Sequence, residues 1–126
     1  MNKFPRRGEI WLVNWNPARG SEQRGKRPAL IIQNDIGNEK ASTSIVAAIS
    51  TSIKLYPMNV KIEPHESGLH YISMVKTSQI LTISKIRLEK KLGQLSEEKI
   101  EEVNQAIKLS LGLENLNTAC RDATNN

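Results

Sequence analysis

The stretch that decides the fold is Glu9-Ile10-Trp11-Leu12-Val13-Asn14-Trp15. In an extended chain Trp11, Val13 and Trp15 fall on one face, and Ile10 and Leu12 fall on the other. Aromatic and β-branched residues in this alternation favour a strand. Because both faces carry apolar side chains, we expect both to be partly buried in a β-rich fold.

Four further segments have strand patterns and extend this prediction along the chain. Pro28 opens one of them, which is tolerated because the missing amide donor falls outside the hydrogen-bond ladder. The turn-forming residues Asn34, Asp35 and Gly37 predict a turn at residues 34–38. The expected strands are residues 27–33, 44–49, 59–63 and 71–75, and the last is open to extension through Ile80.

One amphipathic helix is expected near the C-terminus. Ser96 is a good N-cap, and two glutamates follow it in the first turn, where they favour the positive end of the helix dipole. Gly112 supplies the stop. The helix would pack one apolar stripe on the sheet: Ile100, Val103, Ile107 and Leu111.

Length and charge limit the class of protein. The chain has 126 residues, which suits one domain, and its net charge of +5 suits a polyanionic partner. Its apolar runs are far shorter than the ~20 residues that cross a bilayer, and no signal-peptide pattern opens it, so we expect a cytoplasmic protein with no membrane attachment. We expect one domain at residues 1–113 and a flexible tail at residues 114–126, which has little to bury.

Candidate metal ligands are few. Cys120 is the only cysteine, so it cannot form an intrachain disulfide or a structural zinc site with a second cysteine. The only histidines, His65 and His70, fall in an expected loop at residues 63–70 and are interpreted as solvated side chains. We therefore expect no metal and no cofactor.

The long loop at residues 16–26 concentrates the positive charge. Together with Arg27, which adjoins the rigid second strand, it has four cations and one carboxylate, a net +3. If the strands on either side of residues 34–38 form a meander centred near Glu39, Arg27 comes to lie beside Ser50 and Thr51. A cation and hydroxyls would then meet at one end of the sheet.

The sequence around this loop closely resembles the MazF/PemK toxins of bacterial toxin–antitoxin systems. The combination of Gly20-Ser21-Glu22-Gln23 with Arg27-Pro28 at the start of a strand is specific. The similarity extends over residues 7–113, and the segments that carry it are residues 7–13, 16–23, 27–38, 45–49, 79–83 and 109–113.

This resemblance implies a mainly β fold, a small SH3-like and partly open barrel, with a C-terminal helix. It also implies a homodimer that cleaves single-stranded RNA at short sequence motifs without a metal and is silenced by a cognate antitoxin. Arg27 matches the catalytic arginine of the family, and Ser50 stands where many members have a catalytic threonine. An arginine fork suits a phosphate that gains negative charge, so we assign Arg27 to transition-state stabilisation and Ser50 to hydrogen bonding of the same oxygens.

Two positions depart from the family pattern. Ser78 stands where members commonly have a carboxylate before the glutamine, and Leu81 where they often have arginine. Glu22 is then the remaining candidate for the general base. The residues expected to bind RNA are Arg19, Ser21, Gln23, Arg24, Lys26, Thr51, Lys76 and Gln79.

Two other classes of function stay open at this point. A non-enzymatic toxin of the CcdB type, which binds and poisons DNA gyrase, shares the expected fold, but the Gly-Ser-Glu-Gln and Arg-Pro motifs argue against it. An SH3-like module that binds RNA or peptide would need only the basic loop, and it leaves the rest of the similarity unexplained.

Overall fold

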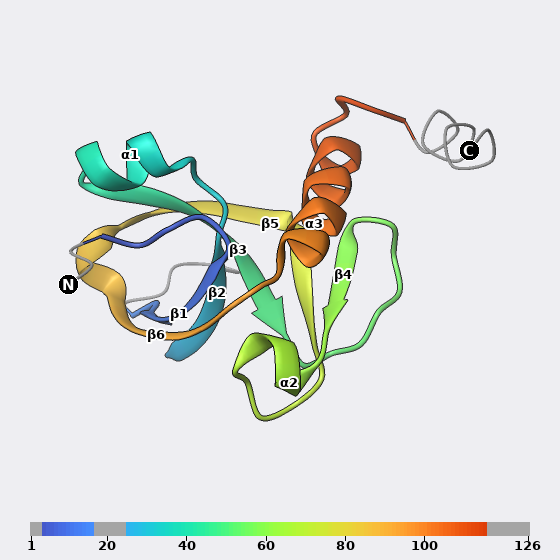
Figure 1. The fold of residues 1–126 in the computed structure, drawn as a ribbon, viewed down its shortest axis with the longest axis horizontal. Coiled ribbons are helices and arrows are strands. Elements are labelled where there is room, and N and C mark those ends of the chain that lie inside the picture. Colours follow the sequence, from blue (N-terminus) through green and yellow to red (C-terminus); the bar gives the residue numbers. More distant parts are fainter. Residues whose placement is uncertain (1–3, 17–24, 116–126) are drawn as a thin grey trace.

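The computed structural model describes residues 4–16 and 25–115. Six strands form one antiparallel sheet in the order β4-β5-β3-β2-β1-β6, and Figure 1 shows helix α3 standing against β4 and β5. The elements are β1 (Glu9–Asn14), β2 (Lys26–Ile31), α1 (Asp35–Lys40), β3 (Thr43–Ser50), β4 (Asn59–Ile62), α2 (Pro64–Ser67), β5 (Ser73–Ser84), the 3-10 turn η1 (Lys85–Arg87), β6 (Leu88–Gln94) and α3 (Glu97–Ser110).

The sheet does not close, because β4 and β6 form its two edges and no pairing between them is present in the described residues. This confirms the prediction of a mainly β, partly open fold with a C-terminal helix. The five predicted strands and the helix all form, with ends displaced by up to a few residues. The exception is β5, which continues to Ser84, well beyond the predicted segment.

Each face of the sheet carries its own apolar cluster. Ile10, Leu30 and Ala47 belong to the cluster that faces α3, which contributes Val103 and Ala106. The opposite face carries the second cluster: Val13, Trp15, Ala29, Ile31, Val46 and Ile83. Both faces of the central strands are therefore buried, as the alternation in β1 predicts.

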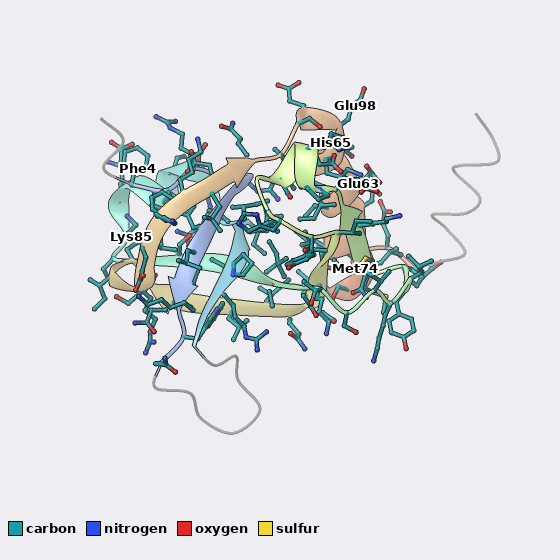
Figure 2. The ribbon with its side chains drawn as sticks, turned by 90° about the horizontal axis from the view of Figure 1, so that it is seen from below. Phe4, Glu63, His65, Met74, Lys85 and Glu98 are labelled. Atoms are coloured by element: carbon teal, nitrogen blue, oxygen red, sulfur yellow. The ribbon has the colours of Figure 1, made fainter. Side chains whose placement is uncertain are left out.

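Helix α3 begins as the sequence predicts. The Ser96 hydroxyl accepts a hydrogen bond from the Lys99 amide (3.2 Å), and Glu97 and Glu98 occupy the first turn. Figure 2 shows Glu98 at the same end of the molecule as His65 of α2, and Lys99 Nζ lies 3.9 Å from a carboxylate oxygen of Glu66. The start of α3 is thus adjacent to α2.

The turn predicted at residues 34–38 is wrong, because the chain forms helix α1 there. The Asn34 side chain accepts a hydrogen bond from the Gly37 amide (2.8 Å) and caps the helix. Asn38 is buried and donates to the carbonyl oxygen of Gln33 (2.9 Å). The same Asx chemistry that forms turns here nucleates a helical segment.

The loop predicted at residues 63–70 also contains a helix, α2. Pro64 occupies its first turn, and Glu63 and Glu66 form a reciprocal capping box. Gly68 ends α2 in the left-handed region, with φ of +78°, and a Cβ there would collide with the carbonyl oxygen of Leu92 in β6. This close backbone approach fixes the segment after α2 against β6.

We expect Gly68→Ala to destabilise the fold by about 3 kcal/mol or more, since left-handed strain of ~1–2 kcal/mol is added to a backbone collision. Gly112→Ala is the matched control, because its φ of +74° is similar and nothing lies within 4 Å of the added Cβ. Urea unfolding measures both free energies. Equal losses in the two variants would contradict the packing role of Gly68.

Candidate functional site

Arg27 and Ser50 come from neighbouring strands. β2 and β3 pair with Ala29 opposite Ala48, Leu30 opposite Ala47 and Ile31 opposite Val46. The same register continued by two residues places Arg27 opposite Ser50. The sequence predicts that these residues are neighbours, but the register it predicts differs from the observed one by one residue.

The pleat puts these two residues on the same face of the sheet. Arg27 has the parity of Ala29, and Ser50 has the parity of Ala48, and both alanines face away from α3. Lys76 of β5 pairs with Ala48 and therefore shares this face, as does Asn59 of β4, which pairs with Lys76. Three of the predicted site residues, Arg27, Ser50 and Lys76, are thus assembled on one polar surface.

Sequence reasoning missed Asn59. The alternation of residues 59–63 shows that Asn59 and Lys61 share a polar face, but only the strand order shows that this face is the one that carries Arg27. Lys61 pairs with Met74, which pairs with Ser50, and its ammonium lies 3.6 Å from Glu63. Two further polar side chains therefore extend the surface across β4.

The Ser50 hydroxyl is half-buried and has a defined neighbour. The backbone amide of Ser52 donates a hydrogen bond to Ser50 Oγ (3.0 Å), which leaves the hydroxyl hydrogen to be donated elsewhere. Thr51, the next residue, is exposed. A hydroxyl held in this way is suited to donate to an oxygen anion.

The start of β2 and the adjacent end of β1 are held by contacts from β6, from the turn η1 and between their own backbones. Lys26 forms an ion pair with Glu89 of β6 (3.0 Å), and its side chain is 57% exposed. The Arg87 guanidinium donates to the carbonyl oxygens of Asn14 (3.0 Å) and Asn16 (2.7 Å), and the Trp15 amide donates to the Gly25 carbonyl oxygen (2.9 Å). No sequence pattern pointed to Arg87, because its role depends on contacts more than 70 residues away.

A wide bulge in β5 positions Gln79. The register shifts between Ala47, which pairs with Ile80, and Ala48, which pairs with Lys76, so residues 77–79 have no partners in β3. Thr77 anchors this bulge, since its buried hydroxyl lies within hydrogen-bonding distance of the carbonyl oxygens of Met58 and Ala106, and its own carbonyl oxygen accepts from Ser110 Oγ (2.8 Å). Gln79 is exposed on the bulge, beside the middle of β3 and about 10 Å along that strand from Ser50.

The remaining predicted site residues lie outside the described residues. They are Arg19, Ser21, Glu22, Gln23 and Arg24. Among residues 4–16 and 25–115 there is no group of three His, Cys, Asp or Glu side chains that could hold a metal ion. Nor does any helix in the described part of the chain have the length and apolarity needed to span a membrane.

One carboxylate outside the site has an altered acidity. Glu101 of α3 accepts hydrogen bonds from the side-chain amides of Gln105 (3.0 Å) and Asn104 (3.3 Å), which lower the pKa of this carboxyl group. Asn104 in turn accepts from the Arg7 guanidinium (2.7 Å). This network joins α3 to the start of the chain, at the end of β2 away from Arg27.

An open antiparallel sheet with one packed helix, and an arginine in register with a serine at a strand end, define a class of small β-proteins with a polar face at one end of the sheet. Residues 6–111 match the family described as PemK-like, MazF-like toxins of type II toxin-antitoxin systems. The chain belongs to this family.

Two curated relatives support the assignment. A protein of Staphylococcus saprophyticus named endoribonuclease MazF is 47% identical over 110 residues, which cover 86% of this chain and 92% of the relative. A protein of the same name from Staphylococcus epidermidis is 46% identical over 112 residues, 87% of this chain and 93% of the relative.

Solved structures share the fold. An endoribonuclease from a mycobacterial species, solved in complex with its cognate antitoxin, superposes with a TM-score of 0.75 at 24% identity, over 87% of this chain and 97% of that one. MazF from Deinococcus radiodurans gives a TM-score of 0.75 at 23% identity, over 88% of this chain and 99% of that one. At these identities the likeness concerns the fold.

We expect Thr77→Val to destabilise the protein by about 1–3 kcal/mol, because it keeps the shape of the side chain and removes a buried hydroxyl that donates to the carbonyl oxygen of Met58, with that of Ala106 also within reach. Thr82→Val is the matched control, since Thr82 is exposed on the same strand. Urea unfolding provides the comparison. An unchanged free energy of unfolding in Thr77→Val would show that the hydroxyl does not anchor the bulge.

Proposed function

We propose that this protein cuts single-stranded RNA as the toxin of a type II toxin–antitoxin system, without a metal, and so inhibits translation and growth. It is an endoribonuclease of the MazF type, as its curated relatives are named. The observation that carries the proposal for the site is the register that places Arg27 opposite Ser50 on one face of the sheet. The motifs and the curated relatives favour this function over a CcdB-like toxin that poisons DNA gyrase.

The proposed reaction uses the RNA itself as the nucleophile. The 2′-hydroxyl loses its proton and attacks the adjacent phosphorus, and the bond from phosphorus to the 5′-oxygen breaks. The 5′-oxygen takes up a proton, so the products are a 2′,3′-cyclic phosphate and a 5′-hydroxyl end. The enzyme must stabilise the additional negative charge on the phosphoryl oxygens between these two events.

Arg27 is the proposed source of this stabilisation. Its guanidinium presents several donors in one plane and stays charged at any working pH, so it is better suited to bind the charged oxygens than to remove a proton. It is also the second residue of β2, two positions before the buried run Ala29–Ile31, which limits the movement of its backbone. Proton donation to the leaving 5′-oxygen is a second role within its reach.

Ser50 is proposed to donate a hydrogen bond to the same phosphoryl oxygens. Its hydroxyl already accepts from the Ser52 amide, so its hydrogen remains available for donation. A serine without a neighbouring base is a poor nucleophile. We therefore assign Ser50 to charge stabilisation and not to covalent catalysis.

Glu22 is the proposed general base. The two positions that depart from the family pattern carry no acid or cation: Ser78 is exposed on the bulge, and Leu81 packs against the apolar cluster away from α3. Within the loop at residues 16–26 the sequence has one carboxylate, that of Glu22. The proposed RNA contacts are Arg19, Ser21, Gln23, Arg24, Lys26, Thr51, Lys76 and Gln79.

The proposed partners follow from the same family. A mycobacterial endoribonuclease of this fold was solved with its cognate antitoxin, and we propose that an antitoxin also binds this chain. We further propose that the protein is a homodimer, since the exposed Leu111 and Leu113 just after α3 provide apolar surface to bury. We propose that this dimer acts in the cytoplasm. Residues 1–113 are proposed as the toxin domain, and the tail predicted at residues 114–126 lies, from residue 116 on, outside the described residues.

We expect the purified protein to cut single-stranded RNA in the presence of EDTA, and Arg27→Ala to lower kcat by about 100-fold or more, as loss of an oxyanion donor does. Arg6→Ala is the matched control, because it removes the same charge just before β1, at the end of that strand that lies away from Arg27. Gel assays of cleavage and circular dichroism of both variants provide the measurement. Full activity in Arg27→Ala, or intact RNA with the wild-type protein, would overturn the proposal.

We expect Ser50→Ala to lower kcat by about tenfold or more, because a hydrogen bond to a charged oxygen is lost. Ser50→Thr restores the hydroxyl and should stay close to the wild-type rate. Ser52→Ala controls for changes in the loop, since its contribution to Ser50 comes from the backbone amide. Single-turnover rates at saturating enzyme report the step, and a slow Ser50→Thr variant would contradict the role of the hydroxyl.

A further inference from the structure

A hollow opens beside the end of β3, next to Ser50. It has a volume of about 630 Å³ and is lined by Thr51, Pro64, His70, Tyr71 and Ile72. Binding pockets for small planar molecules commonly fall between ~300 and ~1,000 Å³. We refer to these five residues as the Tyr71 pocket.

The Tyr71 pocket is built from the ends of three neighbouring strands. Thr51 directly follows Ser50 at the end of β3, Ile72 directly precedes β5, and Pro64 lies two residues after the end of β4. Ser50 pairs with Met74, so Thr51 falls opposite Ser73 when the register is continued. When the register between β2 and β3 is continued, Arg27 falls opposite Ser50, the residue directly before Thr51.

The wall that carries His70 and Tyr71 is fixed at both ends. At one end Gly68 packs directly on the backbone of Leu92 and Gly93 in β6. At the other end the buried Ser73 hydroxyl donates to the Tyr71 carbonyl oxygen (3.0 Å). A short segment held in this way presents its side chains in a preformed arrangement, which lowers the entropic cost of binding.

The side chains of this wall are not buried in the core of the fold. Tyr71 is 72% exposed, and His70 and Ile72 beside it are exposed as well. An aromatic ring left open beside a hollow offers a stacking surface, and the imidazole of His70 and the hydroxyl of Thr51 offer hydrogen-bonding groups. The five lining residues include no Lys, Arg, Asp or Glu.

We propose that the Tyr71 pocket is a nucleobase subsite that selects the RNA sequence next to the cut. This inference rests on the proposed function, because the phosphate at Arg27 brings a neighbouring base to the pocket. The absence of cations from the lining fits an uncharged base and not a phosphate. The base stacks on the Tyr71 ring, and the polar groups of His70 and Thr51 read its edge.

The test is cleavage of an RNA pool with randomised positions, followed by sequencing of the new ends. We expect Tyr71→Ala to flatten the base preference at one position beside the cut by about tenfold, while Tyr71→Phe keeps it because the stacking ring remains. His70→Ala should change which base is preferred there. Tyr56→Ala is the matched control, since Tyr56 is also exposed but lines a different hollow, against α3.

Three outcomes separate this inference from the proposed function. If the wild-type protein leaves the pool intact, the proposed function fails. If Tyr71→Ala cuts the pool with an unchanged preference, or loses rate equally on every sequence, the subsite is refuted while the ribonuclease stands. A flattened preference in Tyr71→Phe as well would also refute stacking as its basis.

A second readout tests contact directly. RNA with 5-iodouracil at the position that lost its preference is bound to Arg27→Ala protein, irradiated, and analysed by mass spectrometry. We expect the base to cross-link to the peptide that contains Tyr71. Cross-linking confined to the Tyr56 peptide would place the base in the other hollow and overturn the assignment.

Discussion

The register between β2 and β3 is the constraint on which the site depends. Leu30 and Ala47 are paired on the face toward α3 and are almost completely buried. Ala29 and Ala48 are paired on the opposite face and are also buried. A slip of one residue would exchange the two faces of a strand and expose the apolar side chains of one cluster. The core therefore fixes the register, and the register fixes which face of the sheet Arg27 shares with Ser50.

The start of β1, at the end of the strand away from Arg27, is fixed by a buried carboxylate. Glu9 is 1% exposed, and its oxygens accept from the Trp11 indole (2.9 Å) and the Arg6 amide (2.8 Å) and pair with Lys91 of β6 (3.1 Å). A buried charge is tolerated only when partners of this kind are present. The network ties β1 to the edge strand β6, and through β1 it supports the ladder that carries Arg27.

The parts of the fold predicted from the sequence are those with a local signal. Apolar alternation identified five strands, and Ser96 with the following glutamates identified the start of α3. Strand β6 was missed because it is an edge strand whose middle is Glu89-Lys90-Lys91, and charged edges lack an apolar alternation. The bulge in β5 was missed for a different reason: Thr77 is held by Met58 and Ala106, and no local pattern encodes such contacts.

The same distinction between local sequence signals and contacts of distant residues holds for the proposed site. Arg27 and Ser50 could be placed together because they lie on consecutive antiparallel strands. The Tyr71 pocket instead needs the ends of three strands and helix α2, where the sequence predicts a loop. Arg27 shares its face of the sheet with Lys76, and the exposed Lys26–Glu89 pair beside it costs little to exchange for a phosphate. Phosphate contacts fix position and base contacts fix sequence. The proposed phosphate site at the start of β2 and the proposed base subsite after β3 therefore assign these two tasks to neighbouring strands.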